Sequence, residues 1–239
     1  MADAGERVSG TRMRELSHPV TDAMMVYPGD PTVTIEPGLV LARDGVDVAR
    51  LHLGSHTGTH LDAPSHTVSN GRTTGEIGLE ELVGGALVVH LAGLGDHDEY
   101  GLDEITAALG GSLPASVPRI VIMDTGWAQY FGTERAFRHP SLRPAAAADL
   151  RARGMHVLAV DTLSPDPTGP GTTSFPVHDV VLGNDDLIVE NIAAIRGLPR
   201  LIQVGLFPLR IDADGAPVRA VAFDVPGPLG RDGARADGA

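Results

Sequence analysis

The sequence predicts one α/β or α+β domain built around a large central sheet. Short runs rich in Val, Ile and Leu recur along the chain, each bounded by Gly, Pro or Asp, and this pattern is typical of strands. Several of the runs are almost continuously apolar, as expected for strands buried on both faces. Helical patterns are fewer. We therefore expect the helices to flank the sheet.

The expected strands lie at residues 32–36, 48–53, 86–91, 119–124, 156–161, 187–189, 201–206 and 218–223. A helix is predicted at 102–109, because Asp103 and Glu104 suit its first turn and two glycines follow it. A second helix is predicted at 144–153, which begins with Pro144 and ends at Gly154. Shorter helices are expected at 79–83 and 191–196.

The 239 residues contain no internal repeat and no linker long enough to separate two domains. We expect one domain over residues 12–226. The segments 1–11 and 227–239 are rich in Gly, Ala, Asp and Arg, and we expect them to be flexible tails.

The formal net charge is −13, from 18 basic and 31 acidic residues. This charge disfavours nucleic acid and anionic membrane surfaces as partners. The first residues contain no apolar stretch typical of a signal peptide, and no apolar run approaches the roughly 18 residues of a membrane span. We therefore expect a soluble cytoplasmic protein that acts on a small molecule.

The chain contains no cysteine, which excludes disulfides, thiolate metal sites and a cysteine nucleophile. A transition metal would have to be held by imidazole and carboxylate groups, and these ligands favour Zn²⁺, Mn²⁺ or Fe²⁺. The Gly-x-Ser-x-Gly motif of serine hydrolases is also absent.

The segment 56–66 concentrates groups able to bind a metal, namely His56, His60, Asp62 and His66. Its glycine and proline residues argue against a helix. In a straight strand the Cα atoms of His56 and His60 would lie roughly 13 Å apart. Two imidazoles on one ion need bonds of about 2.0–2.1 Å. The chain must therefore bend between them, and Gly58 is the residue that permits the bend.

Three further residues are candidates for the same site. His178 precedes Glu190 by twelve residues, and Glu190 follows the apolar run 187–189, where a carboxylate is costly to bury unless it is paired or binds a metal. Alternatively, Glu190 begins a helix. Tyr27 precedes Pro28-Gly29, a turn that could present the ring to a substrate, but an ordinary core or rim position is equally compatible with the sequence.

The segment 56–66 resembles the cyclase family of metal-dependent hydrolases. Bacterial kynurenine formamidases of this family carry the signature His-x-Gly-Thr/Ala-His-x-Asp-x-Pro-x-His, and the chain matches it at every fixed position. The resemblance extends to residues 27–31, to Asp161-Thr162, to the pair His178 and Glu190, and to residues 208–210.

The resemblance implies a single α/β domain with a mixed or antiparallel, barrel-like central sheet and flanking helices, assembled as a homodimer or homotetramer. It implies one or two divalent ions, Zn²⁺ first and Mn²⁺ second. The ligands of the first ion would be His56, His60 and Asp62. Asp62 and Glu190 would be shared with a second ion, which His178 also binds. His66 would be the proton donor and acceptor, and Tyr27 stands where kynurenine formamidases have a substrate-lining Trp.

The expected activity is hydrolysis of an amide, lactam or ester bond in a small aromatic or cyclic molecule by metal-activated water, as in a kynurenine formamidase. Alternatives with the same metal site are an isatin or lactone hydrolase and a polyketide-type cyclase of secondary metabolism. The remaining alternative is a non-enzymatic module that uses the metal structurally, although structural zinc sites are usually rich in cysteine.

Overall fold

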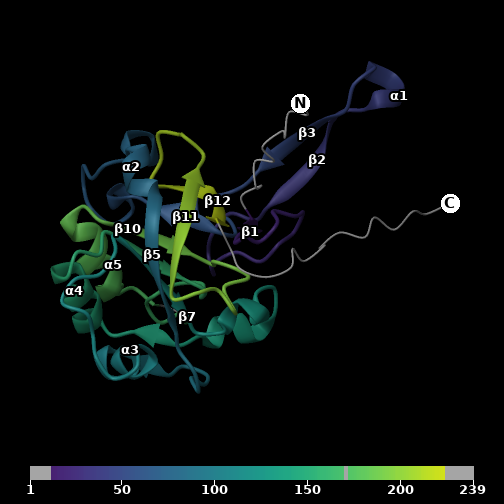
Figure 1. Ribbon diagram of the computed structural model, residues 1–239. Helices are drawn as coiled ribbons and strands as arrows, with labels where there is room; N and C mark the ends of the chain where they lie inside the picture. Colours follow the sequence, from purple (N-terminus) through teal and green to yellow (C-terminus); the bar gives the residue numbers. More distant parts are fainter. Residues whose placement is uncertain (1–11, 170–171, 224–239) are drawn as a thin grey trace, which may run out of the picture.

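A mixed β-barrel forms the centre of the computed structural model, which describes residues 12–169 and 172–223 (Figure 1). Within these residues, one sheet has the strand order β1-β12-β11-β5-β7-β9-β10-β4. Strand β4 also pairs with β12, so seven strands close into a barrel and β1 lies beside β12 as an extra strand. Strands β5, β7, β9 and β10 are parallel, and the other pairings are antiparallel. This confirms the predicted fold class.

The strands of this sheet are β1 (Met13–Glu15), β4 (His60–Asp62), β5 (Val83–His90), β7 (Ile120–Asp124), β9 (Val157–Val160), β10 (Leu187–Glu190), β11 (Leu201–Pro208) and β12 (Gly215–Phe223). Two smaller sheets pair β2 (Thr34–Leu39) with β3 (Val48–His52) and β6 (Glu99–Tyr100) with β8 (Ser141–Leu142). The α-helices are α1 (Leu41–Asp44), α2 (Leu79–Leu82), α3 (Leu102–Ala108), α4 (Pro144–Ala152) and α5 (Pro176–Val181). All eight expected strands are present, with ends shifted by a few residues.

Strands β7, β9 and β10 are buried on both faces, which explains their continuous apolar runs. Side chains alternate between the two faces of a strand. In β5, Val88 packs inside the barrel, whereas Leu87 and Val89 contact the outer layer. That outer layer includes α3, α4 and α5, through Ile105, Leu150 and Val181 among others.

Local sequence explains two of these helices. The Glu104 carboxylate accepts a hydrogen bond from the Gly101 N–H and caps α3, and Pro144 begins α4, as predicted. Helix α5 was not predicted. Its first N–H groups donate to the Asp166 carboxylate, which lies ten residues before the helix begins. A cap supplied from that distance is not visible in the local sequence, where Pro176 is the one start signal of this short helix.

The predicted helix at 191–196 is wrong. Asn191 and Ala194 adopt positive φ angles of 57° and 52°, which are incompatible with a right-handed helix. Ile192 instead forms a bridge with Ser17. Glu190 is therefore the last residue of a strand, and the alternative in which it begins a helix is also wrong. The predicted tails, 1–11 and 227–239, lie outside the described residues.

Residues 34–52 form a separate feature, which we call the arm. Strands β2 and β3 pair as a hairpin with α1 at its tip, and the hairpin projects away from the barrel (Figure 1).

Among the residues that the structure describes, no helix has the length and apolar character required to cross a membrane.

Candidate active site

A bend before β4 brings the first two predicted ligands together. Gly58 has a φ angle of +64°, a left-handed conformation that favours glycine. The rings of His56 and His60 meet edge to face, with their centroids 5.0 Å apart. The predicted bend at Gly58 is therefore present. In β4 the Leu61 side chain packs inside the barrel, so the neighbouring side chains of His60 and Asp62 point outward.

Glu190 reaches the site through the register of the sheet. Strand β10 pairs with β4 in antiparallel fashion, with Glu190 opposite His60 and Ile188 opposite Asp62. Residues directly opposite one another share a face of the sheet. The Glu190 Oε2 atom accordingly lies 3.3 Å from His60 Nε2.

His178 comes from α5, which packs over the same strands. Its Nε2 atom lies 3.5 Å from Glu190 Oε1 and 3.7 Å from Asp62 Oδ2. The side chain of His178 is almost entirely buried. The structure thus places His178 and Glu190 within reach of Asp62, although more than a hundred residues separate them in the sequence.

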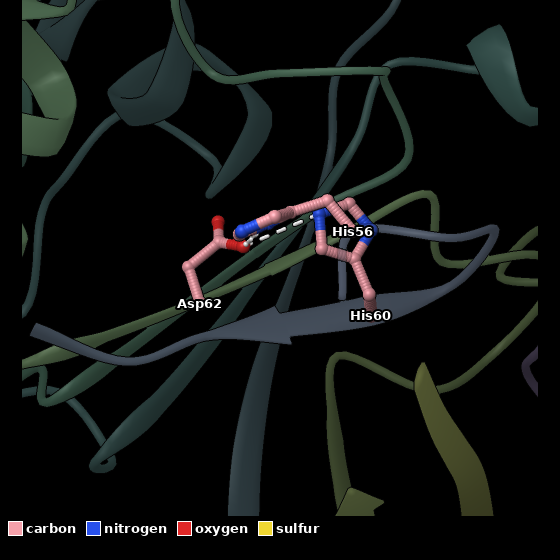
Figure 2. Close-up of side chains that lie close together, drawn as sticks. All are labelled: His56, His60 and Asp62. Atoms are coloured by element: carbon pink, nitrogen blue, oxygen red, sulfur yellow. Dashed lines mark hydrogen bonds and ion pairs between the residues drawn. The ribbon is translucent and has the colours of Figure 1, made fainter. Parts of the chain in front are cut away.

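Asp62 lies at the centre of two groups of donor atoms. One group is His56, His60 and Asp62, drawn in Figure 2, and the second is Asp62, His178 and Glu190. The donor atoms within each group lie within 4.8 Å of one another. Asp62 Oδ1 is 2.7 Å from His56 Nδ1 and 3.2 Å from His60 Nε2. Asp62 thus belongs to both groups, while its role as a shared ligand stays a prediction.

The donor set fits a divalent cation. Asp62 Oδ2 and Glu190 Oε1 are buried and have no hydrogen-bond partner, and a buried carboxylate oxygen without a hydrogen bond is costly. Two imidazoles are also oriented for binding, because His60 Nδ1 lies 2.9 Å from the Gly58 carbonyl and His178 Nδ1 lies 2.7 Å from Asp166. When each Nδ1 carries the proton, Nε2 is free to bind a metal.

The cluster has a strongly polarised charge pattern. Burial disfavours the charged forms, but His60 and His56 outweigh it and hold the pKa of Asp62 well below its usual range. Burial also lowers the pKa of His178, but the hydrogen bond to Asp166 and the charge of Glu190 raise it to about 10. The carboxylates therefore attract positive charge into a buried site, and a cation can supply it in place of protons.

Asp214 is a site residue that the sequence did not reveal. It lies in the loop between β11 and β12, directly before Gly215, which pairs with Asp62. Its Oδ2 atom is 2.9 Å from His56 Nε2 and 3.1 Å from His66 Nδ1. Burial raises the pKa of Asp214, but hydrogen bonds from His56 and His66 lower it to about 2. In the sequence this residue is simply part of an Asp- and Gly-containing turn.

A cleft of about 680 Å³, including its open mouth, lies beside the cluster. Its lining includes the ionisable groups His56, His60, His66, His178 and Glu190, and the apolar side chains of Met25, Val26, Phe131, Leu163 and Phe175. Tyr27 lines the same cleft, and its buried hydroxyl has no hydrogen-bond partner. The predicted ligands, His66 and Tyr27 thus surround one space, while their individual roles stay predictions.

Comparison with known families gives this geometry a context. The family model Cyclase, described as "Putative cyclase", matches residues 14–167. The chain belongs to the cyclase family. The matched region of this cyclase-family chain contains the complete 56–66 signature and Asp166, while His178, Glu190 and Asp214 lie beyond it.

Solved structures share the fold over nearly the whole chain. An isatin hydrolase bound to the product analogue thioisatinate has a TM-score of 0.78 and 21% identity, and the alignment covers 90% of this chain and 93% of that one. Isatin hydrolase A from Labrenzia aggregata, bound to benzyl benzoate, has a TM-score of 0.77 and 23% identity, covering 90% and 94%. A predicted metal-dependent hydrolase from Bacillus stearothermophilus has a TM-score of 0.71 and 23% identity, covering 90% and 100%.

Proposed function

We propose that this cyclase-family chain is a metal-dependent hydrolase that cleaves an amide, lactam or ester bond of a small aromatic or cyclic molecule. The observation that carries the proposal is the pair of buried oxygens without a hydrogen bond, Asp62 Oδ2 and Glu190 Oε1, among three imidazoles beside a cleft that also has apolar lining. Such a donor set calls for a cation, and the cleft gives a small molecule access to it.

A divalent ion held by His56, His60, Asp62, His178 and Glu190 would supply a water of lowered pKa and a Lewis acid for the carbonyl group. The protein's own part is proton transfer. In the neutral tautomer in which His66 Nδ1 donates to Asp214, Nε2 is the nitrogen that can take a proton from water. The same nitrogen then returns the proton to the leaving nitrogen or oxygen.

The cleft walls favour a flat, largely apolar substrate. Phe131 and Phe175 offer rings for stacking, and Tyr27 adds a ring together with a free hydroxyl. N-formylkynurenine and isatin both offer a flat aromatic ring to these walls, and in each compound the scissile amide nitrogen is bonded to that ring. The resemblance to bacterial kynurenine formamidases supports the first compound, and the likeness to isatin hydrolases supports the second.

The test is turnover by protein loaded with Zn²⁺ or Mn²⁺, measured on N-formylkynurenine, isatin and a simple aryl lactone. Turnover of any of the three supports a hydrolase, and the preferred compound decides between the formamidase and the isatin-type activity. Metal-loaded protein that turns over none of them would refute the hydrolase proposal and favour a cyclase of secondary metabolism or a non-enzymatic metal-binding module.

A further inference from the structure

The cleft contains one charged side chain that metal binding and proton transfer do not use. Asp30 lines the cleft beside the predicted metal ligands, but it belongs to none of the groups of donor atoms that could hold an ion. Within the described residues its carboxylate forms no hydrogen bond and no close ion pair, and the charges of His56, His60 and His66 act on it from beyond contact distance. Its carboxylate is therefore available to a molecule that enters the cleft.

A tight turn places Asp30 next to Tyr27. Proline and glycine occupy the two central positions of the sequence Tyr27-Pro28-Gly29-Asp30, and the φ angle of Gly29 is +103°. The Asp30 N–H donates to the Tyr27 carbonyl oxygen over 3.0 Å, which closes the turn. This is the pattern of a type II turn, whose first and last Cα atoms lie within about 7 Å of each other. Both side chains line the cleft, so the turn presents an aromatic ring and a carboxylate to the same space.

The chemistry of this turn suits a cation. None of the residues that line the cleft is an arginine, and the chain contains no lysine, so no basic side chain of that kind neutralises Asp30. Asp30 is half-buried, and burial raises the pKa of its carboxyl group. Water therefore solvates this charge less well than at the open surface, and a cation that reaches it is held more strongly. The Tyr27 ring adds to this attraction, because the face of an aromatic ring attracts positive charge.

We propose that Asp30 and Tyr27 bind a protonated amine of the substrate, so that the preferred substrates are aromatic amides, lactams or esters that carry such an amine. The inference rests on the proposed hydrolase function and narrows its substrate class. N-formylkynurenine carries an amine and isatin does not, so a site for an amine favours the first compound over the second. The net charge of −13 acts in the same direction, since it attracts cationic molecules toward the protein.

Asp30 has one competing role, which is to balance the positive charge of the metal site from a distance. In that role it would act on every substrate alike, because the metal site is common to all of them. In the role proposed here it contributes only when the bound molecule carries an amine. A comparison of charged and neutral molecules of the same shape therefore separates the two roles.

The first test measures binding and requires no turnover. Benzylamine and benzyl alcohol, which share a ring and differ in charge, are titrated by calorimetry into the full-length, metal-loaded protein. Asp30→Asn should weaken the binding of benzylamine about tenfold, the lower end of what a hydrogen bond to a charged group contributes, because Asp30 is only half-buried. The matched control is Asp103→Asn, which removes the same charge from an exposed position on α3 outside the cleft. Equal benzylamine affinities in the two variants would overturn the proposal.

The second test measures kcat/KM on pairs of substrates that differ only in the amine. One pair is N-formylkynurenine and its analogue without the α-amino group, and the other is phenyl acetate with and without a para-dimethylaminomethyl substituent. The wild type should prefer the amine-bearing member of each pair, and in Asp30→Asn the ratio of the two kcat/KM values should fall toward one. A ratio that Asp30→Asn leaves unchanged, with both members slowed alike, would overturn the proposal in favour of the charge-balancing role. Turnover of none of the four compounds would refute the hydrolase function, while the binding test would still decide whether Asp30 holds an amine.

Discussion

Gly215→Ala should weaken metal binding without unfolding the protein. A Cβ atom at this position would lie 2.7 Å from His56 Cε1 and 3.1 Å from each ring nitrogen. Carbon atoms pack at about 3.5–4.0 Å, so the ring must move by roughly 0.8–1.3 Å. His56 cannot move freely, because hydrogen bonds hold it to Asp62 and Asp214 on both sides.

The expected loss follows from the tolerance of a metal site. Ligand distances are held to about 0.2 Å, so the displacement exceeds what a bound ion allows. Disturbing the partners of a ligand costs about 10–100-fold in metal affinity, or about 1.4–2.8 kcal/mol. We expect at least this loss when the ligand itself is displaced. Gly215 does not have a positive φ angle, so an alanine at this position causes no backbone strain of that kind.

Gly84→Ala is the matched control, since Gly84 also lies in a barrel strand and an added Cβ would meet nothing within 4 Å. Both substitutions share the effect of alanine on the unfolded chain. The assay is Zn²⁺ or Mn²⁺ binding in competition with a chelator, together with thermal unfolding of the metal-free proteins. Equal metal affinities in the two variants would refute the reasoning that Gly215 makes room for His56.

Four further predictions follow from the site and its surroundings. His56→Ala and Asp62→Ala should each remove most of the bound metal by elemental analysis, and full metal content in both would contradict the ligand assignment. His66→Ala should keep its metal while kcat falls by roughly 10²–10⁴. Asp214→Asn should lower kcat by a smaller factor. A His66→Ala variant that loses its metal or stays fully active would exclude the proton-transfer role. Tyr27→Ala should raise KM more than it lowers kcat, and a pure kcat effect would contradict uniform binding by the ring. Burial raises the pKa of Glu81, but the hydrogen bond from Arg72 and those from Gly78 and His156 lower it to about 2. The carboxylate therefore stabilises the fold above its ordinary pKa of 4.5, and this stabilisation is lost as the pH falls toward 2. Glu81→Gln should make the free energy of unfolding less dependent on pH over this range, and an unchanged acid transition would contradict the reasoning.

Local patterns predicted most of the fold. Strands β7, β9 and β10 were recognisable because strands buried on both faces need continuous apolar runs, and that requirement acts within each run. Helices α3 and α4 were recognisable because their ends are formed by adjacent residues such as Glu104 and Pro144. Closure of the barrel depends instead on the three residues of β4 pairing with both β10 and β12. A strand so short carries no pattern of its own.

The site divides in the same way. His56, His60, Asp62 and His66 were predicted because one bend places them together. Asp214 was missed because its contact with His56 spans 158 residues, and no local feature of the turn before Gly215 indicates it. The predicted helix at 191–196 is wrong for the same reason. Asn191 has a positive φ angle and is hydrogen-bonded to Thr59, Gly58 and Thr162, which are distant from it in the sequence.

This division of the ligands has a thermodynamic consequence. His56, His60 and Asp62 lie within seven residues, so an unfolded chain can still bind a metal weakly through them. Glu190 and His178 join the same cluster only after β10 pairs with β4 and α5 packs over both. A metal stabilises the native state according to the excess of its affinity for that state over the unfolded chain. The stabilisation of the native state by metal should therefore come chiefly from Glu190 and His178. The bound ion would link β4, β10 and α5, three elements that come from separate parts of the sequence.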